Sequence, residues 1–326
     1  MRFIKIQAEP NPKGATDMQR RELMKYTLVG AASAVASTVL PGRVLADSTH
    51  AARSVPDGRL TDPLTVPASG TIRVAFLISS DAVVIDFAGP WSVFETVMIG
   101  DRMPFSLYTV AASRNPVKVS GGMTIVPEHT YGDAPAPNVI VVPAMNTDAL
   151  APAALEWLRS MQKQTDLTMS VCTGSYVLGE AGLLEGKKAT AHHAGYGALR
   201  AYPGVTVIRG VRYVEDGKIA SSGGLTSGMD LALRVVERYF GRSEAKKTAL
   251  NLEYQGTGWM YPGSNARFAK RPVGTADHPL CQVCEMPVDK KTALKEVYQG
   301  RTYYFCMEWC KNHFLAAPQR FVEHTR

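Results

Sequence analysis

The chain has 326 residues, of which 45% are hydrophobic and 20% are charged, so it can bury a large core and does not fit the disordered class. The formal net charge is +7, but residues 1–46 hold seven basic and three acidic residues, leaving 29 basic and 26 acidic residues and a charge of +3. Because so small a charge gives no support to a nucleic-acid-binding surface, we expect no nucleic-acid partner.

Residues 1–46 have the pattern of an export signal. Arg20 and Arg21 precede an apolar stretch over 26–40, which is too short to cross a bilayer comfortably. Val44-Leu-Ala46 then fits a cleavage site. The paired arginines resemble a twin-arginine signal, with an ordinary secretory signal or a retained anchor as alternatives. We therefore expect a periplasmic protein without stable membrane insertion after cleavage, with a linker over 47–70.

Residues 71–260 alternate between predicted strands and helices. Strands are predicted at 72–78, 105–111, 139–142 and 167–171, with a hairpin at 213–220. Helices are predicted at 90–98, 150–164, 174–183 and 229–240, with Pro90 in the first turn of the first one. This alternation predicts an α/β fold with a mostly parallel sheet and helices on both faces.

Cys172 stands at the end of the predicted strand 167–171, where α/β proteins place their chemistry. A sharp turn there would push the thiol outward, and the N-terminus of the following helix is expected to lower its pKa. The backbone N–H of Thr173 is expected to stabilise a developing anion. On position alone, a buried structural cysteine is an equal alternative.

Several separated motifs resemble the ThiJ/PfpI superfamily. They are Ser170-Val-Cys-Thr-Gly-Ser175, the segments 178–184 and 189–192, and the glycine-rich segment 222–233. Asp86-Phe-Ala-Gly-Pro90 and Leu252-Glu-Tyr254 are similar to the branch that contains isonitrile hydratases and the amidase-like domains of AraC-type regulators. The resemblance covers 71–255 and implies a flavodoxin-like, class I glutamine amidotransferase-like sheet. It is less specific for the reaction, because this superfamily hosts several functions.

Carried over residue by residue, the resemblance implies an isonitrile hydratase-like site that needs no cofactor. Cys172 corresponds to the nucleophile, Asp86 to the acid beside the thiol, and Thr173 to the threonine that follows the nucleophile. His192 corresponds to a histidine near the nucleophile in some relatives. The implied reaction is attack of the thiolate on the terminal carbon of an isonitrile, with Asp86 as general acid, followed by water addition and release of an N-substituted formamide.

The chain departs from the family pattern beside this site. After the strand 139–142 the family shows Pro-Gly-Gly, whereas this chain has Ala144 and Met145 in place of the two glycines. We expect the Ala144 N–H to donate to the substrate, as the first glycine would, and Gly224 to allow close backbone packing near the pocket. With His193 in place of the usual tryptophan, an altered pocket is expected, so the small-molecule substrate stays open.

A linker over 261–277 leads to a second predicted domain at 278–326. This domain holds four of the five cysteines: Cys281, Cys284, Cys306 and Cys310. The CxxC and CxxxC spacings can place four thiolates around one tetrahedral ion. A hairpin is predicted from 294 to 305, and a helix from 306 to 321 that carries Cys306 and Cys310 one turn apart. So small a domain needs a bound metal to hold it together.

Cys284-Glu-Met-Pro-Val288, followed by Tyr303-Tyr-Phe-Cys306 and Cys310, resembles the YHS domain, a small heavy-metal-binding module. Glu285 stands where that domain usually has glycine. We expect zinc in a zinc-finger-like hairpin and helix, with copper(I) as the alternative because Met286 lies beside the thiolates. Two disulfides are a further alternative for the four cysteines.

Two functions follow from these features. The first is a cysteine-dependent hydro-lyase acting on a small uncharged substrate, which Asp86 and Thr173 favour. The second is a non-enzymatic periplasmic metal or redox stress sensor, which the metal module and the altered loop at Ala144 favour. The resemblance also implies a homodimer.

Overall fold

The computed structural model describes residues 62–322. The predicted export signal lies outside the described residues. Within them, no helix has the length and apolar character needed to cross a membrane. The described residues belong to one compact unit, which contains both the sheet domain and the four-cysteine domain.

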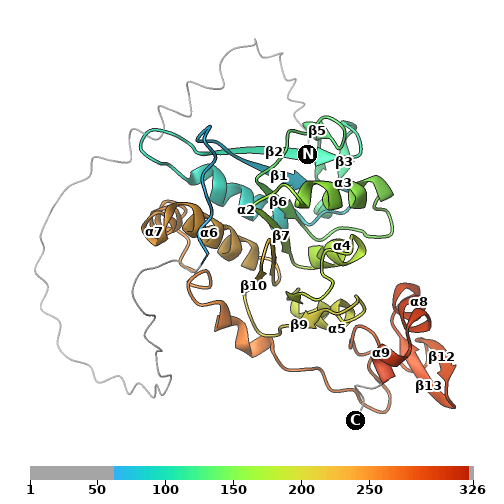
Figure 1. Ribbon diagram of the computed structural model, residues 1–326. Helices are drawn as coiled ribbons and strands as arrows, with labels where there is room; N and C mark the ends of the chain where they lie inside the picture. The colour runs from blue at the N-terminus through green and yellow to red at the C-terminus, as the bar shows by residue number, and fades with distance from the viewer. Residues whose placement is uncertain (1–61, 323–326) are drawn as a thin grey trace, which may run out of the picture. The chain divides into compact units, whose positions relative to one another are not determined.

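The larger domain is built on a seven-stranded sheet with the strand order β10-β11-β7-β6-β1-β2-β5 (Figure 1). Its strands are β1 (Ile72–Leu77), β2 (Phe105–Ala111), β5 (His129–Thr130), β6 (Val139–Val142), β7 (Leu167–Val171), β10 (Tyr213–Asp216) and β11 (Ile219–Ser222). Neighbouring strands run parallel, except in the antiparallel hairpin of β10 and β11. Two short pairs lie outside this sheet: β3 (Val117–Lys118) with β4 (Thr124–Ile125), and β8 (Lys188–Ala189) with β9 (Thr206–Val207).

Helices cover both faces of the sheet (Figure 1). One core contains residues of α2 (Val84–Thr96), α6 (Ser227–Phe240) and α7 (Arg242–Asn251). The other contains residues of α3 (Pro152–Gln162), α4 (Gly174–Glu180) and α5 (Tyr196–Leu199). The sheet has a core on each face because successive side chains of a strand point to opposite sides. In β1, Val74 and Phe76 enter the first core, and Ala75 and Leu77 enter the second. The predicted α/β fold is confirmed.

The main error in the predicted elements concerns the helix around Pro90. Helix α2 begins at Val84, so Pro90 lies inside it rather than in its first turn. The start is fixed from outside the helix, because the Val84 N–H donates to Ser120 Oγ at 3.0 Å. Because the residue that caps the helix lies 36 residues away in the sequence, the residues next to Val84 do not reveal where the helix begins. Helix α7 was not predicted, and the predicted linker 261–277 contains a 3-10 helix, Pro262–Phe268.

The small domain consists of the hairpin β12 (Leu294–Tyr298) and β13 (Arg301–Phe305), followed by α8 (Glu308–Ala316) and α9 (Gln319–Val322). Its core is aromatic, with Phe305, Phe314 and Phe321 buried. The predicted single helix 306–321 is wrong. Cys306 precedes α8 in a bend after β13, and Pro318 separates α8 from α9 because proline cannot continue the first helix.

Candidate thiol site and metal site

Cys172 occupies a strained turn between β7 and α4. Its φ is +60°, in the left-handed region that side chains rarely adopt and that typifies a nucleophile elbow. Its N–H donates to the carbonyl of Gly223 at 3.1 Å, which ties the turn to the end of β11. Gly174 lets α4 start directly against β6, since a Cβ there would lie 2.2 Å from the carbonyl oxygen of Val142. The result is a Cys172 that is only 8% exposed.

Asp86, in the first turn of α2, lies against this thiol. The residue is completely buried, and its Oδ2 accepts a hydrogen bond from the Ala144 N–H at 3.2 Å. Burial raises the pKa of Asp86 from its ordinary 3.8 to about 7, while hydrogen bonds from Ala144 and the Cys172 thiol oppose the rise. A carboxyl that titrates near neutral pH can both take and return a proton.

The pKa of Cys172 moves in the direction opposite to the prediction. Burial raises it from 9.0 to about 12, and the charge of Asp86 adds to the rise. Hydrogen bonds from the backbone N–H and the side chain of Thr173 lower it, but less than burial raises it. Before substrate binds, the Cys172 thiol therefore keeps its proton. Since Asp86 and Cys172 affect each other, they titrate as a pair.

His192 lies against the turn that follows β11. Its ring packs on Gly224, where a Cβ would come within 1.9 Å of His192 Cδ2, as expected for a glycine that permits close packing. His192 Nδ1 accepts a hydrogen bond from the Ala194 N–H at 3.2 Å. Burial, followed by the charge of His193, lowers the pKa of His192. A neutral His192 therefore forms part of the wall beside the elbow.

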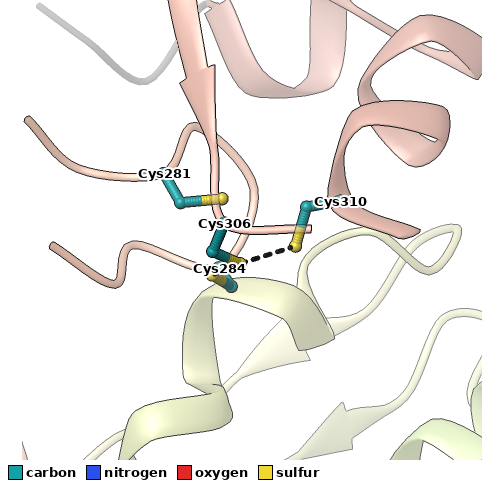
Figure 2. Close-up of side chains that lie close together, drawn as sticks. All are labelled: Cys281, Cys284, Cys306 and Cys310. Carbon is teal, nitrogen blue, oxygen red and sulfur yellow. Dashed lines mark hydrogen bonds between the residues drawn. The ribbon is translucent and has the colours of Figure 1, made fainter. Parts of the chain in front are cut away.

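The four cysteines of the small domain converge from three segments. Cys281 and Cys284 come from the loop before the hairpin, Cys306 from the bend directly after β13, and Cys310 from α8 (Figure 2). Their sulfur atoms all lie within 4.8 Å of one another, with 3.4 Å between Cys284 and Cys306 and 3.6 Å between Cys306 and Cys310. No disulfide joins the cysteines of the described part.

The donor set and its spacing fit a tetrahedral metal ion. Sulfur atoms about 2.3 Å from a central zinc would lie about 3.8 Å from one another, close to the distances observed. Hydrogen bonds among the four thiols shift their pKa values in opposite directions, with those of Cys281 and Cys306 lowered and those of Cys284 and Cys310 raised, so the four thiols titrate as one set. The side chain of Met286, which suggested copper, is 45% exposed. The geometry supports metal binding without identifying the ion.

Comparison with known proteins identifies both domains. The DJ-1/PfpI family matches residues 72–238, and the YHS domain matches residues 282–325. The chain belongs to the DJ-1/PfpI family. Its larger part is thus a DJ-1/PfpI domain. The C-terminal YHS domain contains Cys284, Cys306 and Cys310, and Cys281 directly precedes the matched residues.

Similar proteins of the DJ-1/PfpI family include an enzyme and a regulator. The chain is 33% identical to isonitrile hydratase of Pseudomonas putida over 188 residues, which are 56% of this chain and 78% of the hydratase. It is 30% identical to the HTH-type transcriptional regulator CdhR of Pseudomonas aeruginosa over 46% of each chain, so it spans about half of that regulator. The crystal structure of a ThiJ/PfpI family protein from Pseudomonas syringae is similar with a TM-score of 0.52 and 30% identity, covering 57% of this chain and 76% of that one.

The predicted residues of the DJ-1/PfpI site fall into three groups. Cys172, Asp86 and Thr173 come together, while His192 and Gly224 form the adjoining wall. The Ala144 N–H, which we expected to face the substrate, instead donates to Asp86. It therefore holds the carboxyl in place and is occupied in this structure.

Sequence reasoning missed the residues that join the thiol site to the metal site. They are Tyr176 and Arg200 in the DJ-1/PfpI domain, together with their partners described below. Long-range contacts of this kind leave no local pattern. Glu285 was the one signal in the sequence, because it replaces the usual glycine of the YHS domain. The structure gives this residue a φ of +62°, a conformation that favours glycine.

Proposed function

We propose that the DJ-1/PfpI domain is a cysteine-dependent hydro-lyase that hydrates a small isonitrile-like substrate. The observation that carries this proposal is the buried pair of Asp86 and Cys172, in which the carboxyl has a pKa of about 7 beside the thiol. The identity to an isonitrile hydratase supports it. With only 8% exposure of Cys172, a small uncharged substrate fits this site best.

In the proposed reaction, Asp86 in its ionised form takes the thiol proton as Sγ bonds to the terminal carbon of the isonitrile. Asp86 then returns that proton to the same carbon, which gives a thioimidate with one new S–C bond and one new C–H bond. Hydrogen bonds from Thr173 to the sulfur stabilise the thiolate as it forms. Asp86 next takes a proton from water as the water oxygen adds to the carbon and the C=N π bond breaks, and Asp86 passes this proton to the nitrogen. The remaining hydroxyl proton then moves through Asp86 to the sulfur as the C=O bond forms and the S–C bond breaks. The N-substituted formamide leaves, and Cys172 has regained its proton.

The YHS domain has a separate role in this proposal. Cys281, Cys284, Cys306 and Cys310 would hold one metal ion, with zinc favoured and copper(I) as the alternative. A bound ion would supply a cross-link between the loop, the hairpin and α8. The reaction at Cys172 uses no metal in this scheme.

Formamide production from a panel of isonitriles tests the proposal. The full chain is compared with Cys172→Ala and Asp86→Ala, and folding of each protein is checked by circular dichroism. We expect turnover that both substitutions abolish. If the well-folded wild-type chain turns over none of the isonitriles, the proposed reaction is wrong.

A metal or redox sensor is the second candidate function. It is favoured by the four-cysteine cluster and by the similarity to a transcriptional regulator. A sensor would bind metal or undergo oxidation at Cys172 without turning over any isonitrile. The turnover panel therefore separates it from the hydro-lyase.

Export and assembly complete the proposal. We propose that the N-terminal segment directs twin-arginine export to the periplasm and that the mature protein is a homodimer. Changing Arg20 and Arg21 to lysine should retain the protein in the cytoplasm of a bacterial host. Light scattering should give twice the mass of the mature chain, whereas a monomer mass would contradict the dimer.

A further inference from the structure

The loop that carries two of the cluster cysteines is docked on helix α5 of the DJ-1/PfpI domain. Gly197 of α5 touches the backbone of Cys284, because a Cβ at Gly197 would lie 2.4 Å from the Cys284 carbonyl carbon and oxygen. Beside this contact, Glu285 forms ion pairs with Arg200, at 2.9 Å, and with Arg209. The three charged side chains are only 11%, 16% and 14% exposed, respectively, so water screens these pairs weakly.

Glu285 adopts a backbone conformation that favours glycine. Its φ of +62° costs on the order of 1 kcal/mol for a residue with a side chain. A strained residue persists where its surroundings hold it, and here both ion-pair partners come from the other domain. The glutamate therefore joins the YHS domain to the DJ-1/PfpI domain at the residue directly after a cluster cysteine.

Tyr176 makes a second connection between the domains. It lies on α4, four residues after Cys172, and its hydroxyl donates to the carbonyl of Gly195 at 2.8 Å. Its ring stacks on Trp309, the neighbour of Cys310, with 6.0 Å between centroids and 12° between planes. Tyr176 therefore connects the helix that follows Cys172 with the residue that precedes Cys310.

The segment 193–199 links these contacts to the elbow. It contains a 3-10 turn, His193–Gly195, followed at once by α5. At its start, Gly195 packs against Thr173, with 3.1 Å between the position of a Cβ on Gly195 and Thr173 Cγ2. At its other end, Gly197 meets Cys284. A displacement of the loop that carries Cys281 and Cys284 would therefore reach Thr173, the residue after the nucleophile, through only a few residues.

We propose that metal loading of the four-cysteine site controls the reactivity of Cys172, with Glu285 and Tyr176 as the positioning residues that transmit the effect. The inference rests on the proposed metal site but not on the proposed reaction. A bound ion fixes the loop, so the loop holds segment 193–199 closed over the elbow. Without the ion, the loop loses its cross-link, the segment loosens, and the buried thiol becomes accessible.

The rate of Cys172 alkylation tests this proposal. The full chain is loaded with Zn²⁺ or stripped with a chelator, then treated with iodoacetamide, and the Cys172 peptide is followed by mass spectrometry. Bound zinc is measured on the same samples. We expect alkylation about 5-fold or more faster in the stripped protein, the lower end of typical coupling between two sites.

Two variants identify the connection. Glu285→Gly removes the ion pairs while relieving the backbone strain, so the protein should fold and bind one zinc, yet alkylate quickly with or without it. Tyr176→Phe, which loses the hydrogen bond to Gly195, should also reduce the metal dependence. Glu296→Gln is the matched control, because Glu296 pairs with Lys311 inside the YHS domain and should leave the wild-type metal dependence unchanged.

Equal alkylation rates in zinc-loaded and stripped wild-type protein would overturn the coupling while leaving the metal site intact. Full metal dependence in Glu285→Gly would likewise overturn the assigned connection. If no zinc binds to the wild-type chain, both the metal site and the coupling are wrong. The zinc measurement separates this last outcome from the first two.

Discussion

Asp86 and Cys172 affect each other's titration in a site where neither residue is well exposed, since Asp86 is completely buried and Cys172 is 8% exposed. Their pairing links two distant parts of the chain, the first turn of α2 and the turn after β7. Burial favours the neutral form of each group, and each one's charge or hydrogen bond affects the other's titration.

Stability should fall as the pH rises because of Asp86. Its folded pKa of about 7 is above the ordinary 3.8, so the folded protein holds this proton more tightly than the unfolded chain does. The resulting stabilisation is fully present below pH 3.8 and is lost as the pH rises through 7, with a total of at most about 4 kcal/mol. Urea denaturation from pH 4 to 8 measures it. Asp86→Asn should flatten the pH dependence, and an unchanged slope would contradict the shifted pKa.

The same substitution should make the thiol more acidic. The charge and the hydrogen bond of Asp86 both raise the pKa of Cys172, so Asp86→Asn should lower it by on the order of one unit. Thiolate absorbance against pH measures this value, with Asp86→Asn,Cys172→Ser as the blank that removes the signal of Cys172. A pKa that stays the same or rises would show that Asp86 does not act on the thiol.

Gly224→Ala should disturb the wall beside the elbow. The new Cβ would lie 1.9 Å from His192 Cδ2, so the ring must move, and overpacking of this kind costs about 1–3 kcal/mol. Urea denaturation reports the loss, and the NMR signals of His192 should shift. Gly263→Ala is the control, because no atom lies within 4 Å of the position that its Cβ would take and its φ lies outside the left-handed region. Equal stability of the two variants would contradict the tight contact.

Glu285→Gln should weaken the contact between the DJ-1/PfpI domain and the YHS domain. It leaves Arg200 and Arg209 without their carboxylate partner in a site of low exposure, and we expect a loss of about 2 kcal/mol. Lys247→Gln, which breaks a pair whose lysine is 65% exposed, should change stability by less than about 1 kcal/mol. Urea denaturation of the zinc-loaded proteins compares them. The ion pairs contribute little if both variants unfold at the same urea concentration.

The sequence predicted the features that local patterns encode. The alternation of apolar runs located the main strands and the parallel sheet, and the cysteine spacing located the metal cluster. Cys172 and Asp86 could be paired only through family resemblance, because they are 86 residues apart and meet through the order of the strands.

Features set by tertiary contacts were missed or misjudged. The start of α2 depends on Ser120, and the pKa of Cys172 depends on burial that a sequence does not display. The Ala144 N–H was assigned to the substrate because the carboxyl that occupies it comes from another element. Similarly, Glu285 stood out as an unusual residue, but its arginine partners lie about 80 residues earlier in the chain.

A covalent bond between Cys172 and the substrate carbon is the central claim of this account. Rapid mixing of the wild-type chain with an isonitrile, followed by acid quench within the first turnover and mass spectrometry of the Cys172 peptide, tests it most directly. We expect the peptide to gain the mass of one isonitrile, because the quench stops the reaction before water releases the thioimidate. An unmodified Cys172 peptide, together with formamide production by Cys172→Ala, would contradict the account.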